Sequence, residues 1–218
     1  MEVNHLSLFH LVRKPKTQTE RTPLLIMLHG YGSNEADLFS FADELPEELL
    51  ILSLRAPYAL PPYGHAWYEI NWDGSGKFSN DEQAVASREK IAAFIAEAVT
   101  AYPVDADNVT LVGFSQGCIL ALAVALSYPH LVRNVIGLSG YLNQNILKDG
   151  YEKGDFSRLA VYASHGISDP VIPVEWARKT KPILDALGIV NSYSEFPVGH
   201  GVSPQNLFEL KNWLTQRL

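Results

Sequence analysis

A serine lies between two glycines at residues 113–117, which read Gly-Phe-Ser-Gln-Gly. A strand-like apolar run precedes this motif at residues 109–112, and a helix-like apolar run follows it at residues 119–126. A Gly-x-Ser-x-Gly sequence between a strand and a helix is typical of a nucleophile elbow, where the serine occupies a sharp, strained turn. Glycine two positions before and after the serine removes β-carbons that would crowd that turn. The motif therefore predicts that Ser115 presents its hydroxyl as a nucleophile at the end of a sheet.

A serine hydroxyl becomes a good nucleophile when a base takes its proton, and that base is usually a histidine held by a carboxylate. After this kind of turn the chain order is serine, then acid, then histidine. The downstream histidines are His130, His165 and His200, and the downstream aspartates are Asp149, Asp155, Asp169 and Asp185. Asp169 is the favoured acid because it comes just after a predicted strand, at the sheet edge where α/β proteins place functional groups.

With Asp169 as the acid, His200 is the histidine that remains after it in the chain. His200 follows another predicted strand and has glycine on both sides, so its imidazole can approach the neighbouring loops. Glu195 is the alternative acid, but it lies on the strand just before His200 and is poorly placed to reach it. We expect His165 to shape the loop that carries Asp169.

Attack on a carbonyl also requires donors for the oxygen that becomes negatively charged. In this kind of site one donor is the backbone N–H of the residue after the nucleophile, here Gln116, and the other comes from a loop after an earlier strand. Residues 28–32 read Leu-His-Gly-Tyr-Gly and follow an apolar run, so we assign the second backbone N–H to Tyr31. An ordinary glycine-rich turn is the alternative interpretation of this segment.

Other chemistries do not fit the remaining motifs. Residues 74–78 resemble part of a phosphate-binding loop, but Asn71 replaces its leading glycine and Phe78 its Ser/Thr. No His-Glu-x-x-His motif or other metal-ligand spacing is present, so we expect neither a metal nor a cofactor. The single cysteine, Cys118, excludes an internal disulfide and is expected to be a buried core residue.

The elements that must position these residues alternate between strand-like and helix-like, which predicts an α/β fold with a mostly parallel central sheet and helices on both faces. Residues 6–12 alternate in polarity and predict an antiparallel edge strand. The remaining strands are expected at residues 24–28, 50–54, 109–112, 135–138, 159–163 and 192–196, and the main helices at residues 81–102, 174–187 and from 203 onward. The length of 218 residues fits one domain spanning residues 1–218.

Two longer segments interrupt this alternation. Residues 55–78 have no regular pattern but carry the aromatic residues Tyr58, Tyr63, Trp67, Tyr68, Trp72 and Phe78. Residues 140–157 follow the strand after the elbow helix and form a candidate small cap. Loops longer than about 12–15 residues are uncommon unless they are functional, so both segments are candidate walls of a substrate pocket. The alternative is that both segments only decorate the surface and that their aromatic side chains pack these loops against the rest of the protein.

The composition excludes several classes of protein. Hydrophobic residues make up 47% of the chain, and the net charge of −7 is spread along it, which argues against a nucleic-acid partner. The longest apolar run is much shorter than the ~20 residues that cross a bilayer, so we expect no stable membrane insertion. The first residues lack the basic start of a signal peptide, and we expect a cytoplasmic protein. A homodimer is left open.

The sequence resembles the phospholipase/carboxylesterase family of acyl-protein-thioesterase-like α/β-hydrolases, and its bacterial carboxylesterase branch most of all. The motifs that carry this resemblance are residues 29–34, 55–57 with 65–68, 113–117, 138–142, 165–169 and 199–200. The resemblance runs from about Leu24 to the end of the chain, and the motifs occur in the family's order. Two departures fall near the expected acyl pocket: Asn143 stands where proline is frequent, and Tyr31 is larger than its usual counterpart in the eukaryotic thioesterases.

The resemblance implies an α/β-hydrolase fold with a minimal cap that cleaves small-molecule carboxylic esters, acyl thioesters or lysophospholipids without a cofactor. It places the catalytic triad on Ser115, Asp169 and His200 and the oxyanion hole on Tyr31 and Gln116. The expected substrate pocket consists of Trp67, Tyr68, Tyr141 and Leu142. Two alternatives remain: a binding or regulatory module that retains the triad, and a hydrolase or lyase acting on another type of bond.

Overall fold

The structure is a computed structural model that describes residues 6–73 and 76–218, and the side chains of residues 71–78 lie outside this description. Within these residues the central sheet has seven strands, in the spatial order β1 (His10–Arg13), β3 (Leu50–Leu54), β2 (Leu24–Leu28), β8 (Val109–Phe114), β9 (Asn134–Leu138), β10 (Ala160–Gly166) and β11 (Val190–Phe196). Strand β1 is antiparallel to β3, and all the other neighbouring pairs are parallel. The predicted antiparallel edge strand and mostly parallel sheet are confirmed.

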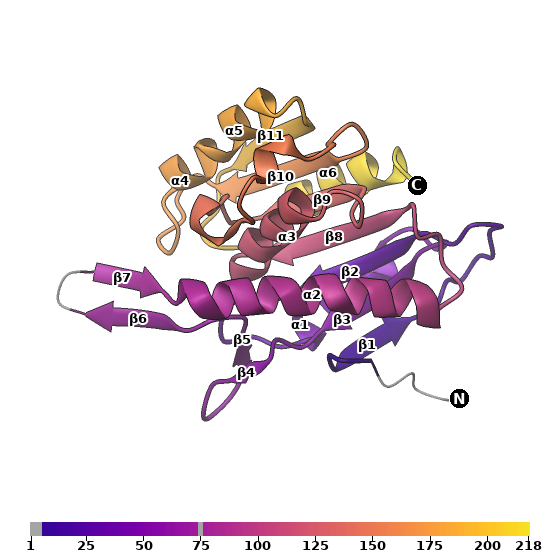
Figure 1. The fold of residues 1–218 in the computed structure, drawn as a ribbon, viewed down its shortest axis with the longest axis horizontal. Helices are drawn as coiled ribbons and strands as arrows, with labels where there is room; N and C mark the ends of the chain where they lie inside the picture. Colours follow the sequence, from indigo (N-terminus) through magenta and orange to yellow (C-terminus); the bar gives the residue numbers. More distant parts are fainter. Residues whose placement is uncertain (1–5, 74–75) are drawn as a thin grey trace.

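Helices cover both faces of this sheet, as expected (Figure 1). The helices are α1 (Ala36–Phe39), α2 (Asp81–Ala101), α3 (Gln116–Ser127), α4 (Val174–Arg178), α5 (Thr180–Ala186) and α6 (Pro204–Thr215). On one face, Leu24 and Ile26 of β2 pack with the apolar side chains of α2 and α3. On the other face, Leu25 and Met27 pack with α1 and α6. Because successive side chains of a strand point to opposite faces, one continuous apolar strand contributes to both halves of the core.

The helix predicted over residues 174–187 is instead two helices, α4 and α5, which meet at Lys179. Pro182 has no backbone N–H, and its ring clashes with the carbonyl four residues earlier, that of Arg178. A single uninterrupted helix is therefore unfavourable at this point. The predicted end of the segment is correct, because Gly188 adopts the left-handed conformation that closes a helix.

The segment of residues 55–78 is more ordered than expected. It contains a small hairpin of β4 (Tyr58–Ala59) with β5 (His65–Ala66), and a second hairpin of β6 (Ile70–Asp73) with β7 (Gly76–Ser79). The second hairpin projects from the body of the molecule beyond the start of α2 (Figure 1). The aromatic residues Trp72 and Phe78, and the glycine and serine at 74–75, fall outside the described side chains or residues.

The candidate cap at residues 140–157 lies mainly on the helices of one face. It contains the short 3-10 helices η2 (Gln144–Ile146) and η3 (Tyr151–Lys153), while a third, η1 (Ala42–Glu44), follows α1. Ile146 and Phe156 are buried in the core shared with α2 and α3, and the buried guanidinium of Arg88 on α2 donates to the Ile146 carbonyl at 2.5 Å. The segment is therefore anchored to this core through its buried apolar side chains.

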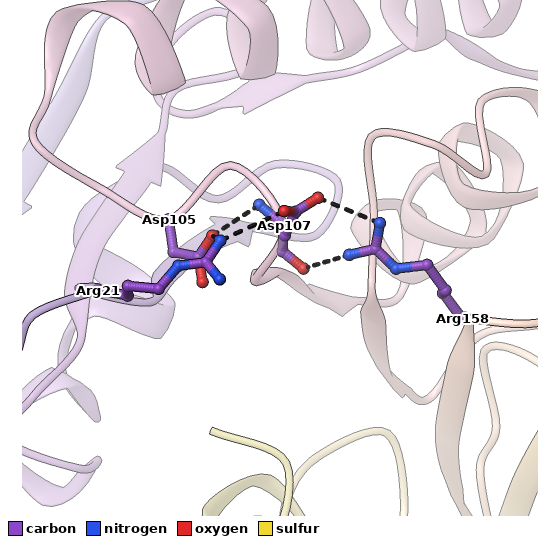
Figure 2. Close-up of polar contacts among 4 residues, drawn as sticks. All are labelled: Arg21, Asp105, Asp107 and Arg158. Atoms are coloured by element: carbon purple, nitrogen blue, oxygen red, sulfur yellow. Dashed lines mark hydrogen bonds and ion pairs between the residues drawn. The ribbon is translucent and has the colours of Figure 1, made fainter.

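At the amino end of the sheet, charged side chains connect three loops (Figure 2). Arg21, just before β2, contacts Asp105 at 2.6 Å and Asp107 at 3.2 Å. Arg158, just before β10, donates to the Asp107 carboxylate at 3.1 Å and to its backbone carbonyl at 3.0 Å. Hydrogen bonds from Arg158, followed by the charges and contacts of Arg158 and Arg21, hold the pKa of Asp107 below its ordinary value.

We expect replacement of Arg158 by methionine to lower the melting temperature only slightly at neutral pH and low salt, because exposed ion pairs contribute little. Because the pKa of Asp107 is lowered in the folded protein, its ion pair stabilises the fold at pH values above the pKa of the unfolded chain, and this stabilisation is lost as pH falls through the pKa of the folded state. The difference in melting temperature between the variant and the wild type should therefore shrink below about pH 4. Salt at about 1 M should screen it as well. Thermal unfolding measures this, with Lys153→Met as an exposed control; a difference that grows in acid or salt would contradict it.

Candidate active site

Ser115 occupies a strained turn between β8 and α3. Its backbone has φ of 54° and ψ of −116°, a conformation that side-chain-bearing residues rarely adopt. A β-carbon on Gly113 would overlap the Gly117 carbonyl, and one on Gly117 would overlap the Leu28 carbonyl of β2. Both flanking glycines are therefore required by close backbone approach, as the motif predicts, and the serine is presented at the carboxyl end of β8.

His200 lies between the serine and the aspartate. Its Nε2 is 2.9 Å from the Ser115 Oγ, and its Nδ1 is 2.7 Å from the Asp169 Oδ2. The three residues follow β8, β10 and β11, whose carboxyl ends lie at one edge of the sheet because these strands are parallel. A carboxylate accepts hydrogen bonds, so Nδ1 carries the proton and Nε2 is free to accept the serine proton. The residues chosen from chain order are thus brought together in space.

The Asp169 carboxylate is fully buried and held by several donors. Its Oδ1 accepts the backbone N–H groups of Val171 at 2.8 Å and Ile172 at 3.0 Å, and its Oδ2 accepts from His200. Burial alone would raise the pKa of Asp169, but the hydrogen bonds from His200 and the two backbone amides outweigh it and lower the pKa. The side chain therefore remains an anion beside the imidazole at neutral pH.

The loop that contains Tyr31 packs directly against the elbow. A β-carbon on Gly30 would meet the Phe114 ring at 3.2 Å and the Ser115 Cβ at 3.4 Å, so this glycine allows the close approach. The amide of Gly32 donates to the His65 carbonyl at 2.9 Å and that of Ser33 to the Gly30 carbonyl at 3.3 Å. These bonds hold the turn around Tyr31 beside the amino end of α3, where Gln116 is the first helical residue.

His29 fixes the start of this loop from inside the core. Its Nδ1 donates to the Gly30 carbonyl at 2.7 Å, and its Nε2 accepts the backbone N–H of Ala56 at 3.1 Å. Burial is the main cause of its lowered pKa, so the ring is neutral at physiological pH. A neutral histidine that uses both ring nitrogens holds the loop without adding charge near the serine.

A cavity of about 380 Å³ opens beside Ser115. Its walls are largely aromatic and aliphatic and include the serine and the imidazole. The lining residues are Tyr31, Tyr68, Ile70, Ser79, Ser115, Gln116, Ile119, Tyr141, Val171, Ile172, Trp176 and His200. A mostly apolar cavity with a few polar groups is typical of a small-molecule site. Tyr68 and Tyr141, both expected in the pocket, are part of this lining.

Two expected pocket residues lie behind the cavity wall, and their assignment requires correction. Trp67 is fully buried, and its indole N–H donates to the His29 carbonyl at 2.9 Å. Trp67 and Tyr68 lie in a bend after β5, where the Trp67 ring packs into the core and Tyr68 lines the cavity. Leu142 is also buried, and its backbone N–H donates to the Thr180 Oγ1 at 2.9 Å.

Several lining residues were missed by sequence reasoning. Val171 and Ile172 lie just beyond Pro170, which follows the chosen aspartate, and this position was the available signal. Trp176 lies on α4 and is 44% exposed, with its ring edge-to-face against Tyr141 at 5.3 Å between centroids. An exposed tryptophan on a helix that otherwise buries Val174 and Ala177 is a signal for a binding surface.

The side chain of Gln116 connects the elbow to the pocket wall. Its Oε1 accepts the Trp67 N–H at 2.8 Å, and its Nε2 donates to the Tyr68 carbonyl at 2.7 Å. Both backbone groups are buried, where an unpaired polar atom would be costly. The glutamine of the Gly-x-Ser-x-Gly motif therefore holds Tyr68 at a fixed position relative to Ser115.

The residues set aside earlier have other partners. Glu195 forms a two-point ion pair with Arg178, at 2.7 and 2.8 Å. Cys118 is buried, and burial raises the pKa of its thiol to about 12. A thiol that remains protonated at neutral pH is a poor nucleophile.

Within residues 6–73 and 76–218, no group of three or more histidine, cysteine or carboxylate side chains is arranged to hold a metal ion. Nor does this part of the chain contain a helix with the length and apolarity needed to traverse a bilayer.

A mostly parallel sheet with helices on both faces and a serine at a strand–helix elbow defines an α/β-hydrolase fold. The chain belongs to the phospholipase/carboxylesterase family, whose sequence profile matches residues 12–218. Among solved structures, a Bacillus cereus carboxylesterase superposes with a TM-score of 0.83 at 20% identity, covering 97% of this chain and 95% of that one. Zea mays acyl-protein thioesterase 2 superposes with a TM-score of 0.77 at 22% identity, covering 96% and 99%.

The curated relatives are likewise named as carboxylesterases or acyl-protein thioesterases. A probable carboxylesterase SOBER1-like protein of Arabidopsis thaliana is 30% identical over 139 residues, which are 63% of this chain and 53% of the relative. Acyl-protein thioesterase 1 of Candida albicans is 24% identical over 217 residues, which are 91% and 94% of the two chains. The match spans little more than half of the plant relative, so activity and substrate are taken up below as proposals.

Proposed function

We propose that this protein is a serine esterase that works through an acyl-enzyme intermediate. His200 takes the proton of the Ser115 hydroxyl while the serine oxygen attacks the substrate carbonyl and forms a tetrahedral intermediate. The intermediate collapses, the imidazolium gives its proton to the leaving alcohol or thiol, and the acyl group remains on Ser115. Water then attacks the acyl-enzyme with His200 again acting as base, and the carboxylic acid leaves.

Asp169 and the two backbone amides have distinct roles in this proposal. The buried Asp169 anion holds Nδ1–H of His200 and stabilises the imidazolium that forms in each half-reaction. The N–H groups of Tyr31 and Gln116 donate to the oxygen that becomes negatively charged. Each such donor typically contributes about 2.7–4 kcal/mol to the transition state.

The observation that carries this proposal is the hydrogen-bonded line from Ser115 through His200 to Asp169, with steps of 2.9 and 2.7 Å. The strained backbone of Ser115 supports it, because such strain is retained mainly where function requires it. A module that only binds a ligand would not require a deprotonating imidazole at hydrogen-bonding distance from the serine.

The proposed substrates are carboxylic esters, acyl thioesters or lysophospholipids whose acyl or alcohol group enters the cavity beside Ser115. The names of the relatives, carboxylesterase and acyl-protein thioesterase, support the first two classes. A hydrolysis screen with p-nitrophenyl esters of increasing acyl length, matched acyl thioesters and lysophospholipids separates the three. The length at which kcat/KM falls reports how much of the cavity the acyl group occupies.

A fluorophosphonate probe tests the proposed nucleophile directly. We expect one mole of label per mole of protein, on the peptide that contains Ser115, because the probe reacts with an activated serine and not with an ordinary hydroxyl. An ester that the protein hydrolyses should slow labelling when it is present together with the probe, because both compete for Ser115. Absence of labelling in folded protein would favour a binding or regulatory module and overturn the proposal.

A further inference from the structure

We infer that Trp67 is a positioning residue for the proposed oxyanion hole, an inference that rests on the proposed function. The two amides of that hole belong to segments far apart in the chain, because Tyr31 follows β2 and Gln116 begins α3. Trp67 is hydrogen-bonded to both segments. Its indole N–H donates to the His29 carbonyl at 2.9 Å, and its backbone N–H donates to the Gln116 Oε1 at 2.8 Å. A single buried residue therefore links the two halves of the hole.

On the first side, the indole orients the backbone that leads to Tyr31. The His29 carbonyl lies just beyond the end of β2, and the indole N–H fixes the plane of the peptide between His29 and Gly30. The next peptide, between Gly30 and Tyr31, is fixed by the His29 Nδ1, which donates to the Gly30 carbonyl at 2.7 Å. Because the C=O and N–H of a planar trans peptide point in opposite directions, holding the Gly30 carbonyl also sets the direction of the Tyr31 N–H.

On the second side, the Gln116 side chain connects Trp67 to the amino end of α3. Gln116 is the first residue of this helix, so its backbone N–H has no carbonyl acceptor within the helix. Its side-chain amide is held at both ends, because Oε1 accepts the Trp67 N–H and Nε2 donates to the Tyr68 carbonyl at 2.7 Å. The helix end that supplies the second donor is thus bound to the same residue as the loop that supplies the first.

Trp67 is itself held in the core. Its side chain is fully buried in the apolar cluster shared with α2 and α3. Its backbone carbonyl accepts a hydrogen bond from the hydroxyl of Ser87 on α2. His29 and Gln116 are buried as well, so loss of a donor from Trp67 would leave a buried oxygen without its partner. Loss of the indole N–H is therefore expected to shift the Tyr31 amide relative to the Gln116 amide.

The test replaces Trp67 by phenylalanine, which retains an apolar ring but has no indole N–H. We expect kcat for a p-nitrophenyl ester to fall about tenfold to a hundredfold, because a small misplacement of groups around the reacting atoms has an effect of this size. KM should stay within about twofold, because Trp67 does not line the cavity. The matched control is Trp213→Phe, at a partly buried tryptophan on α6 that packs against the other core cluster, and it should leave kcat unchanged.

A trifluoromethyl ketone measures the oxyanion donors directly. The Ser115 oxygen adds to the ketone carbon, the serine proton passes to His200, and the ketone oxygen becomes an anion that stays in the hole because no leaving group departs. We expect the Ki of this inhibitor to rise in Trp67→Phe by the same factor as kcat/KM falls. The Ki of the corresponding trifluoromethyl alcohol, which has no carbonyl to attack, should not change.

The link on the other side is tested by Gln116→Met, which removes the acceptor for the Trp67 N–H and nearly keeps the length of the side chain. This variant should also raise the Ki of the ketone. Because both hydrogen bonds belong to one connection, the double variant should lose less activity than the product of the two single losses. Losses that multiply fully would show that the two bonds act independently, which contradicts the proposed link.

Two further outcomes would overturn the inference. One is a folded Trp67→Phe protein whose Ki for the ketone is unchanged, and the other is an equal rise in Ki for the ketone and the alcohol. If phenylalanine prevents folding, benzothienylalanine at position 67 decides in the same way, because sulfur replaces the N–H while the shape of the indole is retained. Failure of the proposed function would instead abolish hydrolysis and fluorophosphonate labelling in the wild type.

Discussion

Replacement of Ser115 by alanine will lower kcat for a p-nitrophenyl ester by about 10⁶-fold, the loss seen when the serine of a comparable triad is removed. The reason is that no acyl-enzyme can form without the hydroxyl, while the imidazole and the oxyanion donors remain. Alanine has nearly the same volume, so the melting temperature should change little. Steady-state hydrolysis and fluorophosphonate labelling measure the loss together.

The matched control is Ser157→Ala, at an exposed serine in the segment before β10. This variant should retain full turnover and full labelling. Normal turnover by the Ser115 variant would contradict the assignment of the nucleophile, and loss of turnover with unchanged labelling would place the reactive serine elsewhere.

Replacement of Asp169 by asparagine should lower kcat by about 10⁴-fold. The carboxylate accepts the Nδ1 proton of His200 at 2.7 Å, whereas an amide can turn its NH₂ toward the ring. The imidazole would then accept at Nδ1 and carry its proton on Nε2, facing the Ser115 hydroxyl with an N–H instead of a lone pair. Steady-state kinetics across pH measure the loss, and high pH should recover part of it because hydroxide can compete as the base.

Asp149→Asn is the control for this substitution, because Asp149 is an exposed aspartate that chain order alone also allows. It should leave kcat unchanged. A fall for Asp149→Asn comparable with that for Asp169→Asn would show that the acid was wrongly assigned.

The central sheet was predictable because its strands are short and almost entirely apolar. β2, β3 and β9 are buried at every position, which is typical of parallel strands covered on both faces. The hairpins within residues 55–78 were not predictable, because their strands are only two to four residues long. Such short strands have no room for a period, and their pairing depends on contacts with the rest of the fold.

Some features of the candidate site were also predictable from the sequence and others were not. Ser115, Asp169 and His200 were predicted from one motif and the order of the chain, and the structure places them at hydrogen-bonding distance in that line. Of the four residues predicted for the pocket, Tyr68 and Tyr141 line the cavity beside Ser115, while Trp67 and Leu142 lie behind its wall. The local sequence indicates that an aromatic segment lies close to the site. It does not specify which side chain of that segment faces the cavity and which faces the core, because this depends on how the backbone is turned in the folded protein.

The amino-acid sequence by itself determined the kind and order of the elements and the strained serine turn. These depend on apolar periodicity and on glycines whose absence of a β-carbon is required locally. The three-dimensional packing determined the shape of the cavity, the break between α4 and α5, and the two hydrogen bonds by which Trp67 links His29 to Gln116. These features arise where segments distant in the chain compete for the same space and the same hydrogen-bond acceptors, and no local pattern specifies which of them prevails.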